Sequence, residues 1–335
     1  MTEQAVIEAV PELGEGFKGE VISPDDVGYD DARAVWNGSI DKRPAVIVRP
    51  RGAADVIDAV NYARAKDLPL AVRCGGHSVA GNGTVDGGVL VDLANLKGVH
   101  VDPEARTARV NGGVLVGELD RETQLFGLAT PTGRVTTTGV GGFTLGGGYG
   151  WLSPKFGLAC DNLLSADVVT ADGRLVTASE SENEDLLWGL RGGSSNFGVV
   201  TSYEFRLHRL GPTVLAGLLF HPIEEAKSLI RAGRDYVESA PEELVTATAI
   251  LQAAPTRPSR RTCAASLCSG CSSSTSASPR RVGPSSLPSR RSGHRRPTWW
   301  RRCPTPPCRA PPTLRTRTGS ATTGSRTTST RSPTT

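Results

Sequence analysis

Apolar positions in the first two thirds of the chain recur with periods that predict both strands and helices. Residues 43–50 (RPAVIVRP) and 68–73 (LPLAVR) are short apolar runs of the kind that form buried strands. Between them, residues 53–65 carry apolar side chains at the spacing of one helical face. This succession predicts a βαβ unit.

The same periodicities continue to about residue 238. Further strands are predicted at residues 88–92, 107–111, 165–170, 174–178, 198–207 and 214–220. Helices are predicted at residues 114–126, 183–190 and 223–238. Asp172-Gly173 separates two of these strands and is a strong hairpin signal.

The composition changes abruptly near residue 255. Residues 256–335 contain no Asp, Glu, Lys, Asn, Gln, Ile, Phe, Tyr or Met, but 16 Arg, 16 Ser, 15 Thr and 11 Pro. All 34 acidic residues and 22 of the 38 basic ones therefore precede this point, so the first 255 residues have a formal charge of −12 although the whole chain has +4. The basic average does not describe the globular part of the protein.

Three interpretations of residues 256–335 stay open. They form a basic arm that binds nucleic acid, or a metal site built on the C-x-x-C pair Cys268 and Cys271, which a missing second pair disfavours. We favour the third, an out-of-frame translation of a GC-rich gene, because a shifted reading of residues 256–271 permits an ordinary globular sequence. Because this segment has almost no aliphatic periodicity with which to bury a core, we expect a disordered tail.

Several classes of protein are disfavoured by the remaining composition. No run approaches the roughly 18 apolar residues of a membrane span. The N-terminal lead, residues 1–42, begins with an acidic stretch that lacks the apolar centre of a secretory signal. Only Cys74 and Cys160 precede the tail, which favours a cytoplasmic protein.

Three glycine-rich segments follow strand ends and are candidates for ligand binding. RCGGHS (residues 73–78) allows the backbone to approach an anion closely. The alternative is a plain tight turn in which the histidine only makes hydrogen bonds within the protein. TTTGVGGFTLGGGYGW (136–151) lacks the P-loop and Rossmann patterns, so a flexible loop is its alternative. GGSSNFGVV (192–200) leads into a strand. Together the three segments predict one extended ligand such as a dinucleotide.

Four motifs in this order resemble the FAD-linked oxidases of the berberine bridge enzyme type, in the vanillyl-alcohol oxidase and p-cresol methylhydroxylase flavoprotein superfamily. They are RCGGHS, TTTGVGGFTLGGGYGW, FGLACDNLLSADVVTADG and LLWGLRGGSSNFGVVTSYEF. The resemblance runs continuously from about residue 43 to 210.

The resemblance implies an FAD cofactor and a specific set of contacts. His77 matches the histidine that bonds covalently to the flavin 8α-methyl carbon. The residues that would wrap the pyrophosphate are Arg73, Cys74, Gly75, Gly76 and Ser78. Those that would line the flavin and ribityl chain are Thr137, Thr138, Gly139, Gly142, Gly147 and Tyr149, with Val200 near the adenine.

Two departures from the family pattern shape the expectations. Val135 occupies the position where some members carry a cysteine linked to flavin C6, so a single histidyl linkage is implied, and Cys74 and Cys160 are expected to be packing or loop residues. The family's usual catalytic base is a tyrosine of the C-terminal portion, whereas the last tyrosine here is Tyr236. The catalytic base therefore stays unassigned, and no metal is expected.

The expected architecture is an α+β flavoprotein. It comprises an FAD-binding module of two α/β subdomains at residues 43–210, the start of an antiparallel-sheet substrate domain at 211–255, and the tail. The implied activity is oxidation of an alcohol, sugar or secondary metabolite, with O2 as acceptor and without nucleic-acid or membrane partners. A catalytically inactive, truncated FAD-binding remnant and a nucleic-acid-binding protein are the alternatives.

Overall fold

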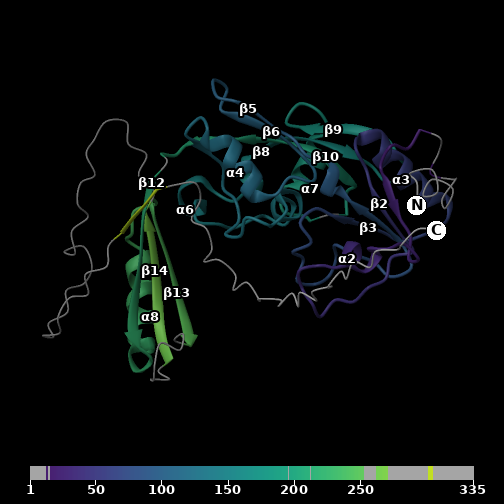
Figure 1. Ribbon diagram of the computed structural model, residues 1–335. Helices are drawn as coiled ribbons and strands as arrows, with labels where there is room; N and C mark the ends of the chain where they lie inside the picture. The colour runs from purple at the N-terminus through teal and green to yellow at the C-terminus, as the bar shows by residue number, and fades with distance from the viewer. Residues whose placement is uncertain are drawn as a thin grey trace, which may run out of the picture.

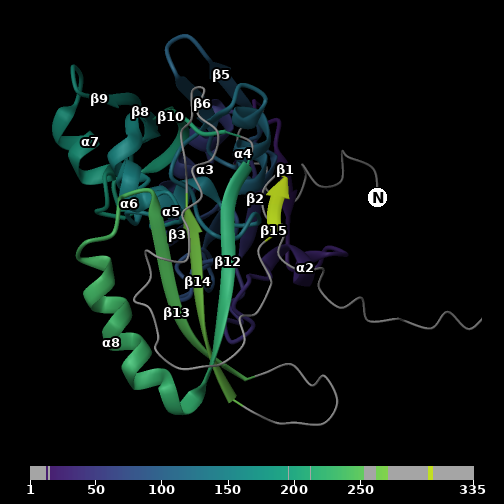
Figure 2. The same ribbon diagram turned by 90° about the vertical axis from the view of Figure 1, so that its left-hand side faces the viewer.

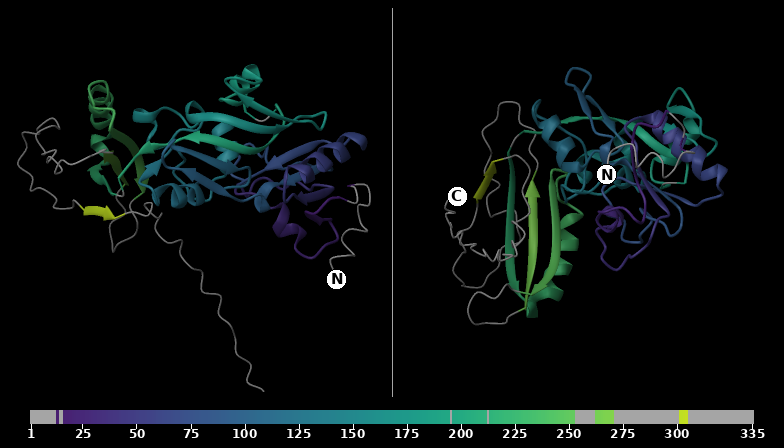
Figure 3. Two further views of the ribbon diagram at one scale, coloured as in Figure 1. Left: turned by 90° about the horizontal axis from the view of Figure 1, so that it is seen from above. Right: turned by 45° about the vertical axis from the view of Figure 1, so that its right-hand side comes forward.

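The computed structural model describes residues 13, 16–194, 196–211, 213–252, 262–270 and 301–304. Three larger sheets follow one another along the molecule, with the N-terminal sheet at one end, an antiparallel sheet in the middle and the C-terminal sheet at the other end (Figures 1 and 3).

The N-terminal sheet has the strand order β1-β2-β4-β3 and contains the predicted βαβ unit. Its elements are β1 (Glu20–Ile22), β2 (Val46–Arg49), α3 (Ala53–Ala65), β3 (Leu70–Arg73) and β4 (Val89–Asp92). Strands β2 and β3 are each parallel to β4, which lies between them, and β1 is antiparallel to β2. Helix α3 packs its buried face against this sheet, which explains the apolar spacing of residues 53–65.

The central sheet is antiparallel, with the order β5-β6-β10-β8-β9. Its strands are β5 (Val99–Asp102), β6 (Thr107–Asn111), β8 (Leu163–Val169), β9 (Leu175–Ser179) and β10 (Val199–Arg206). The predicted hairpin joins β8 to β9, and Gly173 has the left-handed φ of +81° that its turn requires. Helices α4 (Val116–Gln124) and α7 (Glu184–Leu190) contribute side chains to the core beside this sheet.

Short elements connect the sheets. They are α2 (Tyr29–Arg33), η2 (Leu93–Asn95), β7 (Leu128–Ala129), α5 (Val140–Leu145), α6 (Ser153–Phe156), η3 (Cys160–Asn162) and β11 (His208–Arg209). Strands β7 and β11 form a two-stranded ladder. Helix α5 lies inside the second glycine-rich segment, where a flexible loop was the alternative.

The C-terminal sheet has the order β13-β14-β12-β15 and carries one long helix (Figure 2). Its elements are β12 (Thr213–Pro222), η4 (Ile223–Glu225), α8 (Ala226–Val237), β13 (Leu244–Gln252), β14 (Thr262–Gly270) and β15 (Arg301–Pro304). The predicted strand at 214–220 and helix at 223–238 are β12 and α8.

Strands β14 and β15 correct the expectation for residues 256–335, since both lie in the region expected to be disordered. Strand β14 pairs with β12 on one side and β13 on the other, and β15 pairs with β12. A ladder joins backbone N–H and C=O groups, which every non-proline residue carries, so a composition poor in aliphatic residues does not prevent it. Cys271 lies outside the described residues, as does most of the tail.

No helix in the described part of the chain has both the length and the apolar character needed to cross a bilayer.

Candidate functional site

The first glycine-rich segment leaves the edge of the N-terminal sheet. Strand β3 ends at Arg73, and the chain turns at Gly76, whose φ of +68° is a left-handed value that favours glycine. His77 follows at once and is half-buried. The turn therefore presents an imidazole at the end of a half-buried, parallel edge strand.

The first and second glycine-rich segments touch through their main chains. A Cβ built on Gly75 would lie 2.3 Å from the amide nitrogen of Gly139 and 2.7 Å from the carbonyl oxygen of Thr137. A Cβ on Gly139 would lie 2.4 Å from the nitrogen of Gly75 and 2.5 Å from Sγ of Cys74. Only residues without side chains permit this approach.

A side-chain contact joins the same two segments. Nε2 of His77 lies 2.9 Å from Oγ1 of Thr137, within hydrogen-bond distance. Burial lowers the pKa of the His77 imidazole, which favours the neutral ring at pH 7. A neutral imidazole keeps a nitrogen lone pair, which is what a nucleophilic histidine needs.

Helix α5 has an inner and an outer face. Gly141 is buried, and a Cβ there would lie 2.6 Å from Oη of Tyr203. Gly142 is exposed, and a Cβ there would meet no atom of the described residues within 4 Å. The outer face is therefore open beside the His77 segment.

The third glycine-rich segment reaches the other end of α5. The backbone N–H of Ser194 donates to the carbonyl of Leu145 over 2.8 Å. Gly198 has a φ of +133°, and a Cβ there would lie 2.5 Å from the carbonyl oxygen of Val169. All three segments thus converge on α5, as one extended ligand requires.

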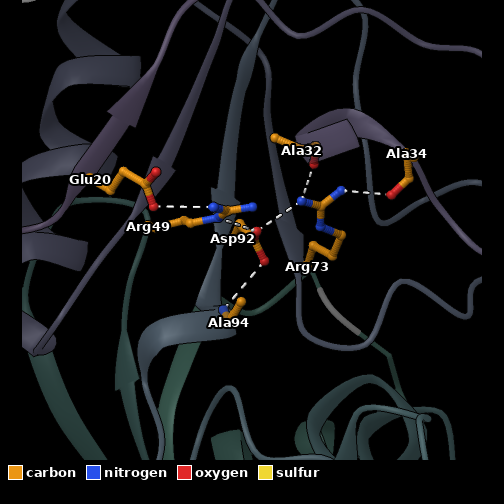
Figure 4. Close-up of polar contacts among 7 residues, drawn as sticks. All are labelled: Glu20, Ala32, Ala34, Arg49, Arg73, Asp92 and Ala94. Atoms are coloured by element: carbon orange, nitrogen blue, oxygen red, sulfur yellow. Dashed lines mark hydrogen bonds and ion pairs between the residues drawn. The ribbon is translucent and has the colours of Figure 1, made fainter. Parts of the chain in front are cut away.

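Arg73 points away from these segments. Its guanidinium pairs with Asp92 at 2.8 Å and donates to the carbonyls of Ala34, at 3.1 Å, and Ala32 (Figure 4). Asp92 also accepts a bond of 2.9 Å from Nε of Arg49. Only the main chain of Arg73 is therefore free to contribute to a ligand site.

Replacing Asp92 by asparagine is expected to lower the free energy of unfolding by about 3 kcal/mol. Asp92 is 2% exposed and Arg73 7%, so the change leaves a buried guanidinium without its counter-charge. Urea denaturation of the variant measures the loss, with the exposed Asp25→Asn as a control expected to stay within about 0.5 kcal/mol of the parent chain. Equal stability of the two variants would contradict the assignment.

Two other predicted contacts are engaged within the protein. The thiol of Cys74 donates to the carbonyl of Val114 over 3.4 Å, and burial raises its pKa to about 11. Oγ of Ser78 accepts a bond of 3.1 Å from the N–H of Asn82. Cys160 is buried, in agreement with a packing role. Neither cysteine has the lowered pKa of a reactive thiol.

The remaining predicted residues lie at the two extremes of burial. Val200 is only 3% exposed and belongs to the core of the central sheet, so its side chain faces the interior. Tyr149 is exposed, and the Arg134 guanidinium lies 5.5 Å from its ring centroid. The same guanidinium lies 4.5 Å from the ring of Trp151. Val135, at the position of the second flavin linkage, is exposed.

Thr138 and Gly147 complete the predicted set. The carbonyl of Thr138 accepts a bond of 2.9 Å from the N–H of Val116, which holds the segment onto α4. Gly147 has a φ of +97° just beyond α5, a left-handed value suited to glycine. Both residues therefore fix the course of the second glycine-rich segment.

Asp120 was not singled out from the sequence, although it bonds the loop that leads into the second glycine-rich segment. It lies on α4, and its Oδ1 accepts a bond of 3.3 Å from Oγ1 of Thr132. Burial raises the pKa of Asp120 to about 6. Asp120 is only partly buried on a nine-residue helix, and no sequence pattern predicts this environment for its carboxyl group.

The raised pKa of Asp120 predicts a pH-dependent stability. Its folded pKa of about 6 exceeds the unfolded value of about 4, so the folded state binds the proton more tightly. Its stabilisation is therefore fully present below about pH 4 and is lost as the pH rises through about 6, by up to about 2 kcal/mol. Urea denaturation between pH 4.5 and 7.5 should show this slope in the parent chain and a flatter one in Asp120→Asn. Parallel pH profiles would refute the assignment.

Within the described residues, no group of three or more His, Cys, Asp or Glu side chains is arranged to hold a metal ion.

Comparison with known proteins identifies the class of this site. Residues 44–179 match the family described as FAD binding domain. The (R)-6-hydroxynicotine oxidase of Paenarthrobacter nicotinovorans is 43% identical over 203 residues, 61% of this chain and 44% of that protein.

Two solved structures share the fold. The crystal structure of 6-hydroxy-D-nicotine oxidase from Arthrobacter nicotinovorans is 36% identical with a TM-score of 0.71, over 77% of this chain and 56% of that one. Physcomitrella patens BBE-like 1 is 27% identical with a TM-score of 0.69, over 80% and 56% of the two chains. This chain spans about half the length of the relatives it matches.

The fold and the converging glycine-rich segments define an FAD-binding flavoprotein domain. Residues 44–179 match an FAD-binding domain, and the similar proteins are FAD-linked oxidases of the vanillyl-alcohol oxidase and p-cresol methylhydroxylase type and of the berberine bridge enzyme-like type.

The residues present fit an FAD. Backbone amides of two touching glycine-rich segments offer donors to a pyrophosphate. The open face at Gly142 leaves space that a side chain would fill, and a neutral imidazole stands at the junction of the segments.

Proposed function

We propose that this chain carries FAD covalently on His77 and serves an oxidase that acts on a small-molecule C–H bond. The observation that carries the proposal is the half-buried imidazole of His77, held against Thr137 where two glycine-rich main chains meet, with a pKa that burial lowers. A histidine satisfied inside the protein core would have no open surface beside it.

The chain's own residues would have distinct parts in holding the cofactor. Main-chain groups of residues 73–78 would bind the pyrophosphate, since the Arg73 side chain is occupied by Asp92. Thr137, Thr138 and the open face of α5 at Gly142 would line the flavin and ribityl chain. Main-chain groups around Val200 would lie near the adenine, because its side chain is in the core.

The attachment would be an oxidative substitution. The N–H bond of His77 and one C–H bond of the 8α-methyl group would break, an N–C bond would form, and O2 would take up the two hydrogen atoms as H2O2. His77 acts as the nucleophile, and its lowered pKa keeps a lone pair available at neutral pH.

FAD held there would supply the redox chemistry, taking hydride from a substrate carbon at N5 and passing electrons to O2. The candidate substrates are alcohols, sugars and secondary metabolites. A relative named for 6-hydroxynicotine adds hydroxylated N-heterocycles to the compounds worth testing. The catalytic base stays unassigned.

The test begins with the flavin content of the purified chain after acid denaturation. A yellow precipitate with a mass increment of one FAD supports the linkage. A colourless precipitate contradicts it. The bound flavin is then mixed without oxygen with a panel of alcohols, sugars and hydroxylated heterocycles, with dithionite as the positive control.

Bleaching by a panel member, followed by H2O2 on admission of air, supports the oxidase. Reduction by dithionite alone would favour a flavin-binding protein without turnover.

A further inference from the structure

The imidazole of His77 has a neighbour outside the glycine-rich segments. The indole of Trp36 stacks on it, with ring centroids 5.5 Å apart and planes at 17°. This separation lies in the range where offset aromatic pairs attract. Trp36 is nevertheless 66% exposed, so the indole buries little surface in making this contact.

The backbone around Trp36 is fixed to the His77 segment independently of the indole. The N–H of Trp36 donates to the carbonyl of Gly76 over 3.1 Å. Nδ2 of Asn37 donates to the carbonyl of Val79 over 2.9 Å. On the other side, Arg73 holds the carbonyl of Ala34 (Figure 4). Three hydrogen bonds, one between main-chain groups and two from the side chains of Asn37 and Arg73, therefore hold the backbone that places the indole on the face of the imidazole.

Two contacts of different direction then define the orientation of the imidazole. The Thr137 hydroxyl meets Nε2 at the edge of the ring, and Trp36 covers one face. A hydrogen bond at one ring nitrogen leaves rotation about that direction free, and a stacked neighbour removes this freedom. The pair together fixes both the tilt and the direction of the other ring nitrogen.

We propose that Trp36 is a positioning residue for the attachment of FAD to His77. It holds the imidazole plane so that a ring nitrogen faces the 8α-methyl carbon during the N–C bond formation described above, in which O2 takes up the two hydrogens. The inference rests on the proposed covalent linkage. It assigns a role to a residue of the N-terminal lead, outside residues 44–179.

A merely structural role predicts a different outcome. The high exposure of Trp36 means that its truncation removes little buried surface, so the melting temperature should barely move. Loss of ring orientation slows a reaction that depends on the direction of approach, without changing the other contacts of the ligand. Rate of attachment and thermal stability therefore separate the two roles.

The experiment follows covalent attachment in the full chain. Chain prepared from riboflavin-limited cells is mixed with FAD in air, and acid-stable flavin is measured over time by in-gel fluorescence. Total bound FAD is measured in parallel by filtration. Trp36→Ala and Trp36→Phe are compared with Trp188→Ala, which removes a tryptophan that is 81% exposed on a different element, α7.

Trp36→Ala should attach FAD about tenfold more slowly, with unchanged total binding and melting temperature. Trp36→Phe keeps an aromatic face and should remain within about twofold of the parent chain. Trp188→Ala should match the parent chain.

Attachment of FAD to Trp36→Ala at the parental rate would overturn the role of Trp36 and leave the proposed linkage to His77 standing. Slower attachment explained by weaker total binding or a lower melting temperature would also overturn it. Absence of acid-stable flavin in the parent chain would instead overturn the proposed linkage, and the role of Trp36 with it.

Discussion

Replacing His77 by alanine is expected to remove all acid-stable flavin from the protein. The imidazole of His77 lies where the first two glycine-rich segments meet. Burial lowers its pKa, which favours the neutral, nucleophilic form of the ring. Alanine offers no nitrogen to bond. Mass spectrometry under denaturing conditions should find one FAD increment in the parent chain and none in His77→Ala.

The matched control is His100→Ala, which removes an exposed histidine from β5. It should keep the full FAD increment. Because the backbone cradle at Gly75 and Gly139 is unchanged in His77→Ala, this variant should still bind FAD reversibly. An FAD increment that persists in His77→Ala would move the linkage elsewhere, and the raised pKa of the Cys74 thiol argues against that residue.

Local periodicity was sufficient for most elements before residue 255. The predicted helix at residues 53–65 agrees with α3, because its apolar stripe packs on a sheet of the same domain. The predicted strand at residues 107–111 agrees with β6. Strand β5 was missed, since its alternating pattern Val99–Asp102 has only two apolar positions and depends on pairing with β6.

Helix α5 shows a limit of propensity arguments. Glycine is unfavourable in helices, and the segment around Gly141 and Gly142 was open to interpretation as a loop. Its helical course depends on tertiary packing: Val140 and Leu145 are buried in the core, and Gly141 leaves room for the hydroxyl of Tyr203. The neighbours that decide this are not adjacent in the sequence.

The candidate site was predictable in its main-chain part and less so in its side chains. Glycine patterns and the family resemblance singled out residues 73–78 and 136–151, which do lie together. Trp36 carried no signal, since its partner His77 is far along the chain and no periodic element joins them. The direction of the Arg73 guanidinium depends on Asp92, which is the last residue of a different strand, β4.

The described part of the N-terminal lead belongs structurally with the FAD-binding fold. Strand β1 extends the sheet through β2, and Oη of the buried Tyr29 donates to the carbonyl of Pro44 over 2.6 Å. Lys42 donates to the carbonyls of Gly81 and Thr84 beyond the His77 segment. Irregular backbone and single side-chain bonds hold this part of the chain, so its apolar residues need not recur with a regular period. Sequence patterns therefore did not predict that it belongs to the FAD-binding domain.

Gly75→Ala is expected to cost about 3 kcal/mol of unfolding free energy and to weaken FAD binding by about a hundredfold. Its methyl group would lie 2.3 Å from the nitrogen of Gly139 and 2.7 Å from the carbonyl oxygen of Thr137. Both are backbone atoms, so no side-chain rotation can relieve the clash. The two glycine-rich segments must separate. Urea denaturation and FAD titration measure the two effects, and a variant of parental stability would contradict the main-chain contact.

Gly142→Ala should separate stability from binding. The new methyl group meets no described atom within 4 Å, and alanine is a better helix former than glycine, so α5 should gain about 0.5 kcal/mol. If the open face is the place of the ligand, FAD affinity should fall about tenfold. Gly52→Ala, also in open space but before α3, should leave FAD affinity unchanged. A glycine whose replacement stabilises the protein and weakens the ligand is retained for binding, whereas unchanged affinity in Gly142→Ala would exclude this face of α5 from the FAD site.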